Sequence, residues 1–196
     1  MTQASGKQSM TPFELLGLEA RMDLRRAEID GAYRRAISKA HPDRAGVVQE
    51  SDDARGVEDL NEARRVLTDP ESRARALLDL LGADEGNSAT RSADDALPDG
   101  FLMEIMGTRM EIEAELGELA GASAEDRERA RDRWESWAQN RRDEAIASMT
   151  AHFERIGVAD EGARVEAVAE ARRALNAWRY IERLIEQLDP DHGPVM

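Results

Sequence analysis

The stretch ISKAHPDRAG, residues 37–46, decides the fold because it ends one helix and turns the chain toward the next. The apolar residues upstream recur every three to four positions, which predicts an amphipathic helix: Ile29, Ala32, Tyr33, Ala36, Ile37 and Ala40. A residue before proline is disfavoured in the helical region, so this helix is expected to end at His41, before Pro42. We therefore expect His41, Pro42 and Asp43 to lie in a loop.

A second amphipathic pattern follows this loop, with negative charge at its start in Asp52 and Asp53. Its apolar positions are Val57, Leu60, Ala63, Val66 and Leu67. Two such helices with a short connection are expected to pair as an antiparallel hairpin. Shorter helices are predicted from Thr11-Pro12 and from Asp69-Pro70 to Gly82, and Asp23 is the expected cap of the helix that ends at His41.

Residues 82–100 contain Gly, Asn, Ser, Asp and Pro without periodicity, which predicts a linker or long loop. Three long helical patterns follow, with breaks near residues 121–123 and 157–160. No stretch shows the alternation typical of a strand. The predicted fold class is all-α, with a small helical domain followed by a three-helix bundle.

Composition excludes several classes of function. The net charge of −14 argues against nucleic-acid binding, which needs an excess of Lys and Arg. The chain has no Cys, so disulfides and thiolate metal sites are excluded. No apolar run is long enough to span a membrane and no signal-peptide pattern is present, so we expect a cytoplasmic protein without membrane contact. No phosphate-binding GxxxxGK[ST] loop occurs either.

A lone His-Pro-Asp is most simply a helix-ending turn, but its flanking blocks resemble the J-domain of the DnaJ co-chaperones. The blocks occur in the order found in that family: residues 13–18 (FELLGL), 33–35 (YRR), 39–44 (KAHPDR) and 60–70 (LNEARRVLTDP). The resemblance implies that the loop and the second helix dock on a DnaK-type chaperone and stimulate its ATPase. The residues implied in this contact are His41, Pro42, Asp43, Arg44, Arg34, Arg35 and Lys39. An arginine-rich face also suits an acidic partner surface, although such a face is usually only solvated.

The second half of the chain narrows the resemblance to one group of J-proteins. Residues 72–82 (SRARALLDLLG) and 99–105 (DGFLMEI) resemble HscB-type J-proteins, in which a J-domain is joined to a three-helix bundle that binds the iron–sulfur scaffold protein IscU. The domains expected on this basis are a disordered tail at 1–10, a J-domain at 11–82, a linker at 83–100, a client-binding bundle at 101–190 and a tail at 191–196. The partners implied are a DnaK/HscA-type chaperone and IscU.

A helical-wheel argument supports a binding surface on the first bundle helix. Its bundle-facing stripe is Phe101, Ile105, Ile112, Leu116 and Leu119. The methionines form a second apolar strip in a different sector, and Met is favoured at adaptable binding surfaces. By resemblance, the scaffold-contacting positions are Leu102, Met103, Met106 and Tyr180, with Met110 extending the strip. The alternatives are that the strip packs on the J-domain or widens the core.

Two positions depart from the family pattern. Gly107 and Met110 stand where the family has acidic side chains, which leaves a J-protein with a different client as the alternative function. The surrounding region is still acidic, because residues 84–126 hold twelve Asp and Glu against two Arg, and this favours a basic partner. The three histidines have no metal-ligand spacing, so a hydrolase or metal enzyme is the least supported class. We expect no enzyme activity, no cofactor and no metal.

Overall fold

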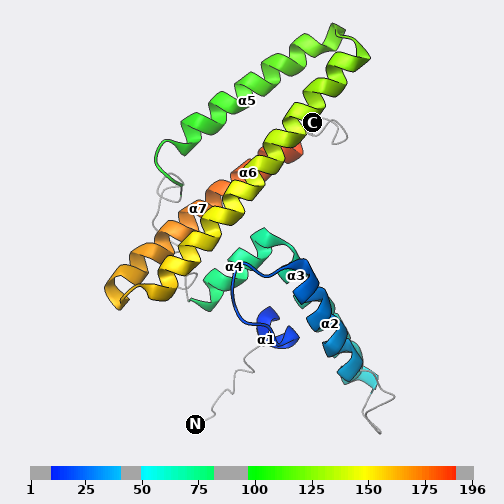
Figure 1. Ribbon diagram of the computed structural model, residues 1–196, viewed down its shortest axis with the longest axis vertical. Helices are drawn as coiled ribbons and strands as arrows, with labels where there is room; N and C mark the ends of the chain where they lie inside the picture. The colour runs from blue at the N-terminus through cyan, green and yellow to red at the C-terminus, as the bar shows by residue number, and fades with distance from the viewer. Residues whose placement is uncertain (1–9, 41–49, 82–96, 189–196) are drawn as a thin grey trace, which may run out of the picture. The chain divides into compact units, whose positions relative to one another are not determined.

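The computed structural model describes residues 10–40, 50–81 and 97–188, and every regular element in these ranges is a helix. The chain divides into two compact units, residues 1–80 and 81–196. The first unit contains α1 (Pro12–Leu16), α2 (Arg26–Ala40), α3 (Glu50–Thr68) and α4 (Pro70–Leu80), and the second contains α5 (Phe101–Glu118), the 3-10 turn η3 (Leu119–Gly121), α6 (Ala124–Val158) and α7 (Glu161–Leu188) (Figure 1). The predicted all-α class is confirmed. Apart from Met10, the predicted tails lie outside the described residues, and the predicted domain boundaries stay predictions.

The first helix of the first unit is fixed at both ends by its own residues. The Thr11 hydroxyl accepts a hydrogen bond from the Glu14 backbone N–H, while the Glu14 carboxylate accepts one from the Thr11 N–H at 2.8 Å. This reciprocal cap satisfies two backbone donors that the helix leaves free. Gly17 ends the helix with φ of +62°, a left-handed conformation that favours glycine. Phe13 and Leu16 are thereby held in the core against α2 and α3.

The helices α2 and α3 pack side by side as an antiparallel hairpin. The Tyr33 hydroxyl donates to the Asn61 side chain at 2.6 Å, and the Arg64 guanidinium donates to the Asp30 carboxylate at 2.9 Å. Between these two contacts the residue number rises from 30 to 33 on α2 and falls from 64 to 61 on α3. The two helices therefore run in opposite directions. Their buried seam consists of Ile29, Ala32, Leu60, Ala63 and Leu67. Apolar burial along this seam is the main stabilising contribution to the hairpin.

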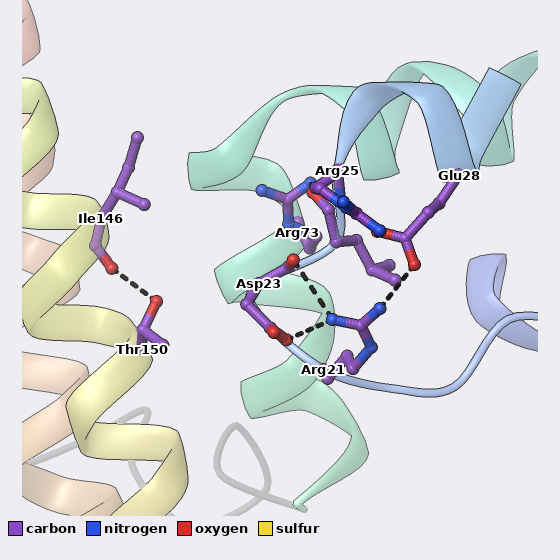
Figure 2. Close-up of polar contacts among 8 residues, drawn as sticks. Arg21, Asp23, Arg25, Glu28, Arg73, Ile146 and Thr150 are labelled. Atoms are coloured by element: carbon purple, nitrogen blue, oxygen red, sulfur yellow. Dashed lines mark hydrogen bonds and ion pairs between the residues drawn. The ribbon is translucent and has the colours of Figure 1, made fainter.

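The prediction that Asp23 caps α2 is wrong, because the helix begins three residues later at Arg26. Figure 2 shows the Arg21 guanidinium between Asp23 and Glu28, with ion-pair distances of 2.6 and 2.7 Å. The Glu28 carboxylate also accepts a hydrogen bond from the Arg25 N–H at 3.0 Å and so occupies the position of a capping group. The non-helical turn before Arg25 allows Met22 and Leu24 to enter the core. Similarly, α3 begins at Glu50, slightly before the predicted start at Asp52.

Arg73 on α4 is a buried charge, with a relative exposure of 5%. Its guanidinium donates to the Leu67 carbonyl of α3 at 2.6 Å and to the Leu24 carbonyl before α2 at 3.2 Å. Burial lowers the pKa of Arg73, while the carboxylates of Asp69 and Asp23 act in the opposite direction. One side chain thus ties α4 to the end of α3 and to the segment that precedes α2.

The second unit is built on the pairing of α6 with α7, which is antiparallel. Arg155 pairs with Glu170 at 2.5 Å near the turn, and Arg142 pairs with Glu182 at 2.8 Å at the far end. The Trp178 indole N–H donates to the same Glu182 carboxylate at 3.0 Å. The apolar core between the helices includes Ala138, Met149, Ile156, Ala167, Ala171, Leu175 and Trp178. Both predicted breaks are confirmed, because one separates η3 from α6 and the other separates α6 from α7.

The helix α5 packs against the pair of α6 and α7 through few contacts. The Phe101 ring meets the Tyr180 ring edge-on at a centroid distance of 6.3 Å. Glu104 pairs with Arg141 at 2.8 Å, and Glu115 pairs with Arg133. Ile112 is fully buried, whereas Phe101 and Ile105 are only half-buried. The helix α5 therefore buries one narrow side and leaves most of its surface in solvent.

Candidate functional site

The first candidate surface is the basic side of the hairpin. Arg34, Arg35 and Lys39 are exposed on α2, and the Arg34 guanidinium donates to the Asp30 carbonyl one turn earlier at 3.2 Å. His41, Pro42, Asp43 and Arg44 lie outside the described residues. The described cations project from a helix whose other side is fixed by the seam with α3. Such a surface accelerates encounter with an acidic partner through long-range electrostatic attraction.

The second candidate surface is an apolar patch on α5. Met103, Met106 and Met110 have relative exposures of 83%, 63% and 69%, and Leu102 is also exposed. We call these four residues with Tyr180 the α5 patch. The exposure of the methionines argues against the alternative in which the strip widens the bundle core. A contiguous group of exposed large apolar side chains is typical of a surface that binds another protein.

The aromatic pair positions Tyr180 in this patch. Tyr180 comes from α7 and contacts Phe101, the first residue of α5, so it lies beside the N-terminal turn of α5. The Arg183 guanidinium lies over the Tyr180 ring at 5.9 Å from its centroid. A cation over an aromatic face restrains the ring while leaving the rest of the ring accessible. The structure thus brings the predicted Tyr180 to the end of α5 that carries Leu102 and Met103.

The carboxylates of α5 differ in their partners. Three of them are paired: Glu104 with Arg141, Glu113 with Arg109 and Glu115 with Arg133. Glu111 and Glu118 are exposed and make no ion pair with a described residue. Three arginines are therefore engaged by carboxylates of α5, and the negative charges of Glu111 and Glu118 remain.

Sequence reasoning missed two residues that shape the α5 patch and one that anchors the first unit. Arg183 follows Tyr180 by three positions on a helix, a spacing that places the two side chains side by side and could have revealed the stacking. Arg141 restrains Glu104 from a distant part of the chain, and no local pattern indicates that pairing. Arg73 lies four residues before the buried Leu77, and this helical spacing indicates an inward-facing arginine.

Other chemical sites are not supported among the residues that the structure describes. No three His, Asp or Glu side chains gather there in a way that could hold a metal ion. The Nδ1 atom of His152, on α6, is buried without a hydrogen-bond partner. Burial, and then the neighbouring Arg155, lower the pKa of His152 and favour its neutral form. Within the described ranges, no helix combines the length and the hydropathy needed to cross a membrane.

Comparison with a family model identifies the class of protein to which the chain belongs. The family model of the DnaJ domain matches residues 11–76, the part of the chain that contains α1, α2, α3 and the first part of α4. The antiparallel hairpin with its basic second helix is thus a J-domain, and the protein is a J-domain protein. The partner indicated for such a domain is an Hsp70-type chaperone.

Curated relatives then define the family. Over 179 residues the chain is 34% identical to the co-chaperone protein HscB homolog of Burkholderia multivorans, and the alignment covers 90% of each chain. The corresponding protein of Burkholderia vietnamiensis is 33% identical over the same length and coverage. The chain therefore belongs to the HscB family of J-domain co-chaperones. These relatives are named as co-chaperones, which indicates a non-catalytic role.

Two solved structures share the fold. The crystal structure of human co-chaperone protein HscB matches with a TM-score of 0.64 and 20% identity, covering 98% of this chain and 87% of the other. The chaperone HscB from Vibrio cholerae matches with a TM-score of 0.54 and 22% identity, covering 93% and 99%. At these identities the two structures support the architecture of a J-domain followed by a helical bundle.

Proposed function

We propose that this protein stimulates the ATPase of a DnaK/HscA-type chaperone and delivers the iron–sulfur scaffold protein IscU to it. The observation that carries the proposal is the exposed α5 patch, which lies in a different unit from the J-domain. A protein that brings a client to a chaperone needs two surfaces that can be occupied at once. The basic side of α2 and the α5 patch are the candidates for these two surfaces, one in each unit.

The division of roles follows from the chemistry of each surface. Arg34, Arg35 and Lys39 offer positive charge to the chaperone, and His41, Pro42, Asp43 and Arg44 complete that contact in the resemblance to J-domains. Leu102, Met103, Met106, Met110 and Tyr180 offer apolar area to the client. Apolar area removed from water contributes about 25 cal/mol per Å², so a patch of this kind can hold a partner. Nothing in this arrangement requires the protein to hydrolyse ATP itself.

The test is a calorimetric titration of the full chain with purified IscU, alongside an assay of chaperone ATPase stimulation. The double variant Leu102→Ala with Met103→Ala should weaken scaffold binding and leave the basal stimulation of the ATPase intact. His41→Gln should abolish stimulation and leave helicity and scaffold binding intact. Unchanged scaffold affinity in the double variant would refute a binding role for the patch, and full stimulation by His41→Gln would refute the docking role of the loop.

A J-domain co-chaperone for a different client is the second candidate function. The observation that favours it is the pair Gly107 and Met110, which stand on the exposed side of α5 where the family has acidic side chains. Absence of binding to IscU, combined with normal ATPase stimulation, would select this alternative.

A further inference from the structure

The Arg34 guanidinium, on the basic side of α2, does not use the ion-pair partner that its own helix offers. Asp30 lies four residues before Arg34, and an acidic residue followed by a basic one at this spacing favours a pair within a helix. In the structure the Nε atom of Arg34 donates instead to the main-chain carbonyl of Asp30 at 3.2 Å. Arg34 is exposed and makes no ion pair with any residue that the structure describes. Its positive charge therefore remains available to a partner.

A cation from the neighbouring helix occupies the Asp30 carboxylate. The Nε and Nη2 atoms of Arg64, on α3, lie 2.9 and 2.8 Å from the same carboxylate oxygen. The other carboxylate oxygen lies 3.8 Å from the Nε atom of Arg26, which precedes Asp30 by one turn. A basic residue before an acidic one is the less favourable order on a helix, and this distance is long. Arg64 is therefore the main partner of Asp30, in place of Arg34.

Tyr33 on α2 restrains Arg64 in this position. The guanidinium carbon of Arg64 lies 5.0 Å from the centroid of the Tyr33 ring. The Tyr33 hydroxyl in turn donates to Asn61, one turn before Arg64 on α3, at 2.6 Å. A side chain that is already restrained loses less conformational entropy when it forms an ion pair. The side chains of Arg64 and Asp30 are 42% and 30% exposed, so solvent screens their pair less than a fully exposed one. These contacts favour Arg64 over Arg34 as the partner of Asp30.

We propose that Arg64 is a positioning residue for stimulation of the chaperone, because it occupies the Asp30 carboxylate and thereby keeps the Arg34 cation available to the chaperone. Without Arg64, the Asp30 carboxylate would pair with Arg34 one turn further along α2. The pair would draw the Arg34 charge back onto its own helix and weaken its attraction to an acidic partner surface. The inference rests on the proposed function, in which the chaperone meets the basic side of α2.

The test measures stimulation of a purified DnaK/HscA-type ATPase by variants of the full chain. Arg64→Ala should raise the concentration needed for half-maximal stimulation by about two- to threefold, the effect of engaging Arg34 in an ordinary pair within a helix, and leave the maximal rate unchanged. Adding Asp30→Asn to Arg64→Ala should restore the parent's value, because no carboxylate then competes for Arg34. The control is Arg65→Ala, which removes an arginine paired with Glu62 at 2.6 Å on the same helix and should act as the parent does.

Two further measurements separate this role from a merely structural one. In the Arg34→Ala background, Arg64→Ala should have no additional effect on stimulation, because the two substitutions act through the same cation. In nitrogen-15 NMR spectra of the protein alone, the Nε–H resonance of Arg34 should shift in Arg64→Ala and return in Asp30→Asn with Arg64→Ala. The NMR measurement does not depend on the chaperone.

The outcomes separate this inference from the proposed function. If the parent stimulates the ATPase and Asp30→Asn with Arg64→Ala is as impaired as Arg64→Ala, then Arg64 touches the chaperone itself or only holds the hairpin, and the inference is wrong. An effect of Arg64→Ala that persists in the Arg34→Ala background would overturn the inference as well, because the lost charge would then act without Arg34. If the parent does not stimulate the ATPase, the proposed function is wrong and Arg64 has no such role, whatever the Arg34 resonance shows.

Discussion

At the scale of single residues, Arg73 is a position where one substitution should strongly destabilise the J-domain. Arg73→Ala leaves the Leu67 and Leu24 carbonyls without their donor and opens a cavity. Unsatisfied buried acceptors and lost packing together should cost about 2–4 kcal/mol of unfolding free energy. The three tryptophans, at positions 134, 137 and 178, all lie in the second unit. Arg73→Ala should therefore lower the unfolding midpoint seen by circular dichroism while tryptophan fluorescence changes little.

The matched control is Arg75→Ala on the same helix. Arg75 is half-exposed and its distance to Glu71 is 3.8 Å, so its loss should change the unfolding free energy by no more than about 0.5 kcal/mol. Equal effects of the two substitutions would show that the buried hydrogen bonds of Arg73 do not stabilise the domain.

His152 should make the second unit sensitive to mild acid. Burial lowers its pKa, so the folded state favours the neutral ring and binds a proton less readily than the unfolded chain. This contribution to stability is complete above the ordinary histidine pKa of about 6.5 and is lost as the pH falls through the lowered value. His152→Gln should therefore lose less stability than the parent between about pH 7.5 and pH 5.5, as measured by tryptophan fluorescence during urea unfolding.

Carboxylates contribute to the pH dependence of stability in a separate and more acidic pH range. They therefore do not obscure the comparison of the parent with His152→Gln. The hydrogen bond from Arg155 lowers the pKa of Glu170, and the stability that it contributes is lost only as the pH falls below the ordinary glutamate value. Identical pH profiles for the parent and His152→Gln would mean that His152 is equally accessible to protons in both states.

At the scale of elements, the N-terminal cap of α6 offers a prediction of local stability. The Ser123 hydroxyl accepts a hydrogen bond from the Asp126 N–H at 3.1 Å and donates one to the Asp126 carboxylate at 2.7 Å. Ser123→Ala should cost about 1 kcal/mol of unfolding free energy, measured by tryptophan fluorescence. Ser148→Ala, at an exposed position inside the same helix, should be neutral or slightly stabilising. If the two variants had the same unfolding free energy, the Ser123 cap would not stabilise the protein.

Helix boundaries were predictable wherever a cap and a break coincide in the sequence. Ser123 and Asp160 each cap the helix that follows them, through backbone donors at Asp126 and Ala163. The prediction failed at Asp23, because Arg21 engages this carboxylate and Met22 is drawn into the core. Both effects depend on tertiary contacts.

The candidate site was predictable to a similar extent. Periodicity separated Met103, Met106 and Met110 from the bundle-facing residues of α5, and the structure confirms their exposure. The partners of the charged side chains were not predictable, because a sequence with many Glu and Arg offers many equivalent pairs. The ion pairs of Glu104 with Arg141 and of Glu182 with Arg142 exist only once the helices are aligned.

At the scale of the whole molecule, charge should govern the encounter with the chaperone. The double variant Arg34→Ala with Arg35→Ala should require more co-chaperone for half-maximal ATPase stimulation, and it should be less sensitive to added salt than the parent. The reason is that the parent's attraction is screened over about 10 Å at 0.1 M salt. Arg127→Ala with Arg131→Ala removes two exposed arginines from α6 and is the control. Equal losses in both double variants would indicate an effect of net charge alone.

The solvent-facing thioethers of α5 also make this co-chaperone vulnerable to peroxide. Hydrogen peroxide transfers an oxygen atom to a methionine sulfur and leaves water, which converts an apolar side chain into a polar sulfoxide. Mass spectrometry of peroxide-treated protein should find Met103, Met106 and Met110 oxidised well before Met22 and Met149, whose relative exposures are 2% and 1%. If the proposed function holds, oxidative stress would then interrupt client delivery without unfolding the protein, and methionine sulfoxide reductases would restore it.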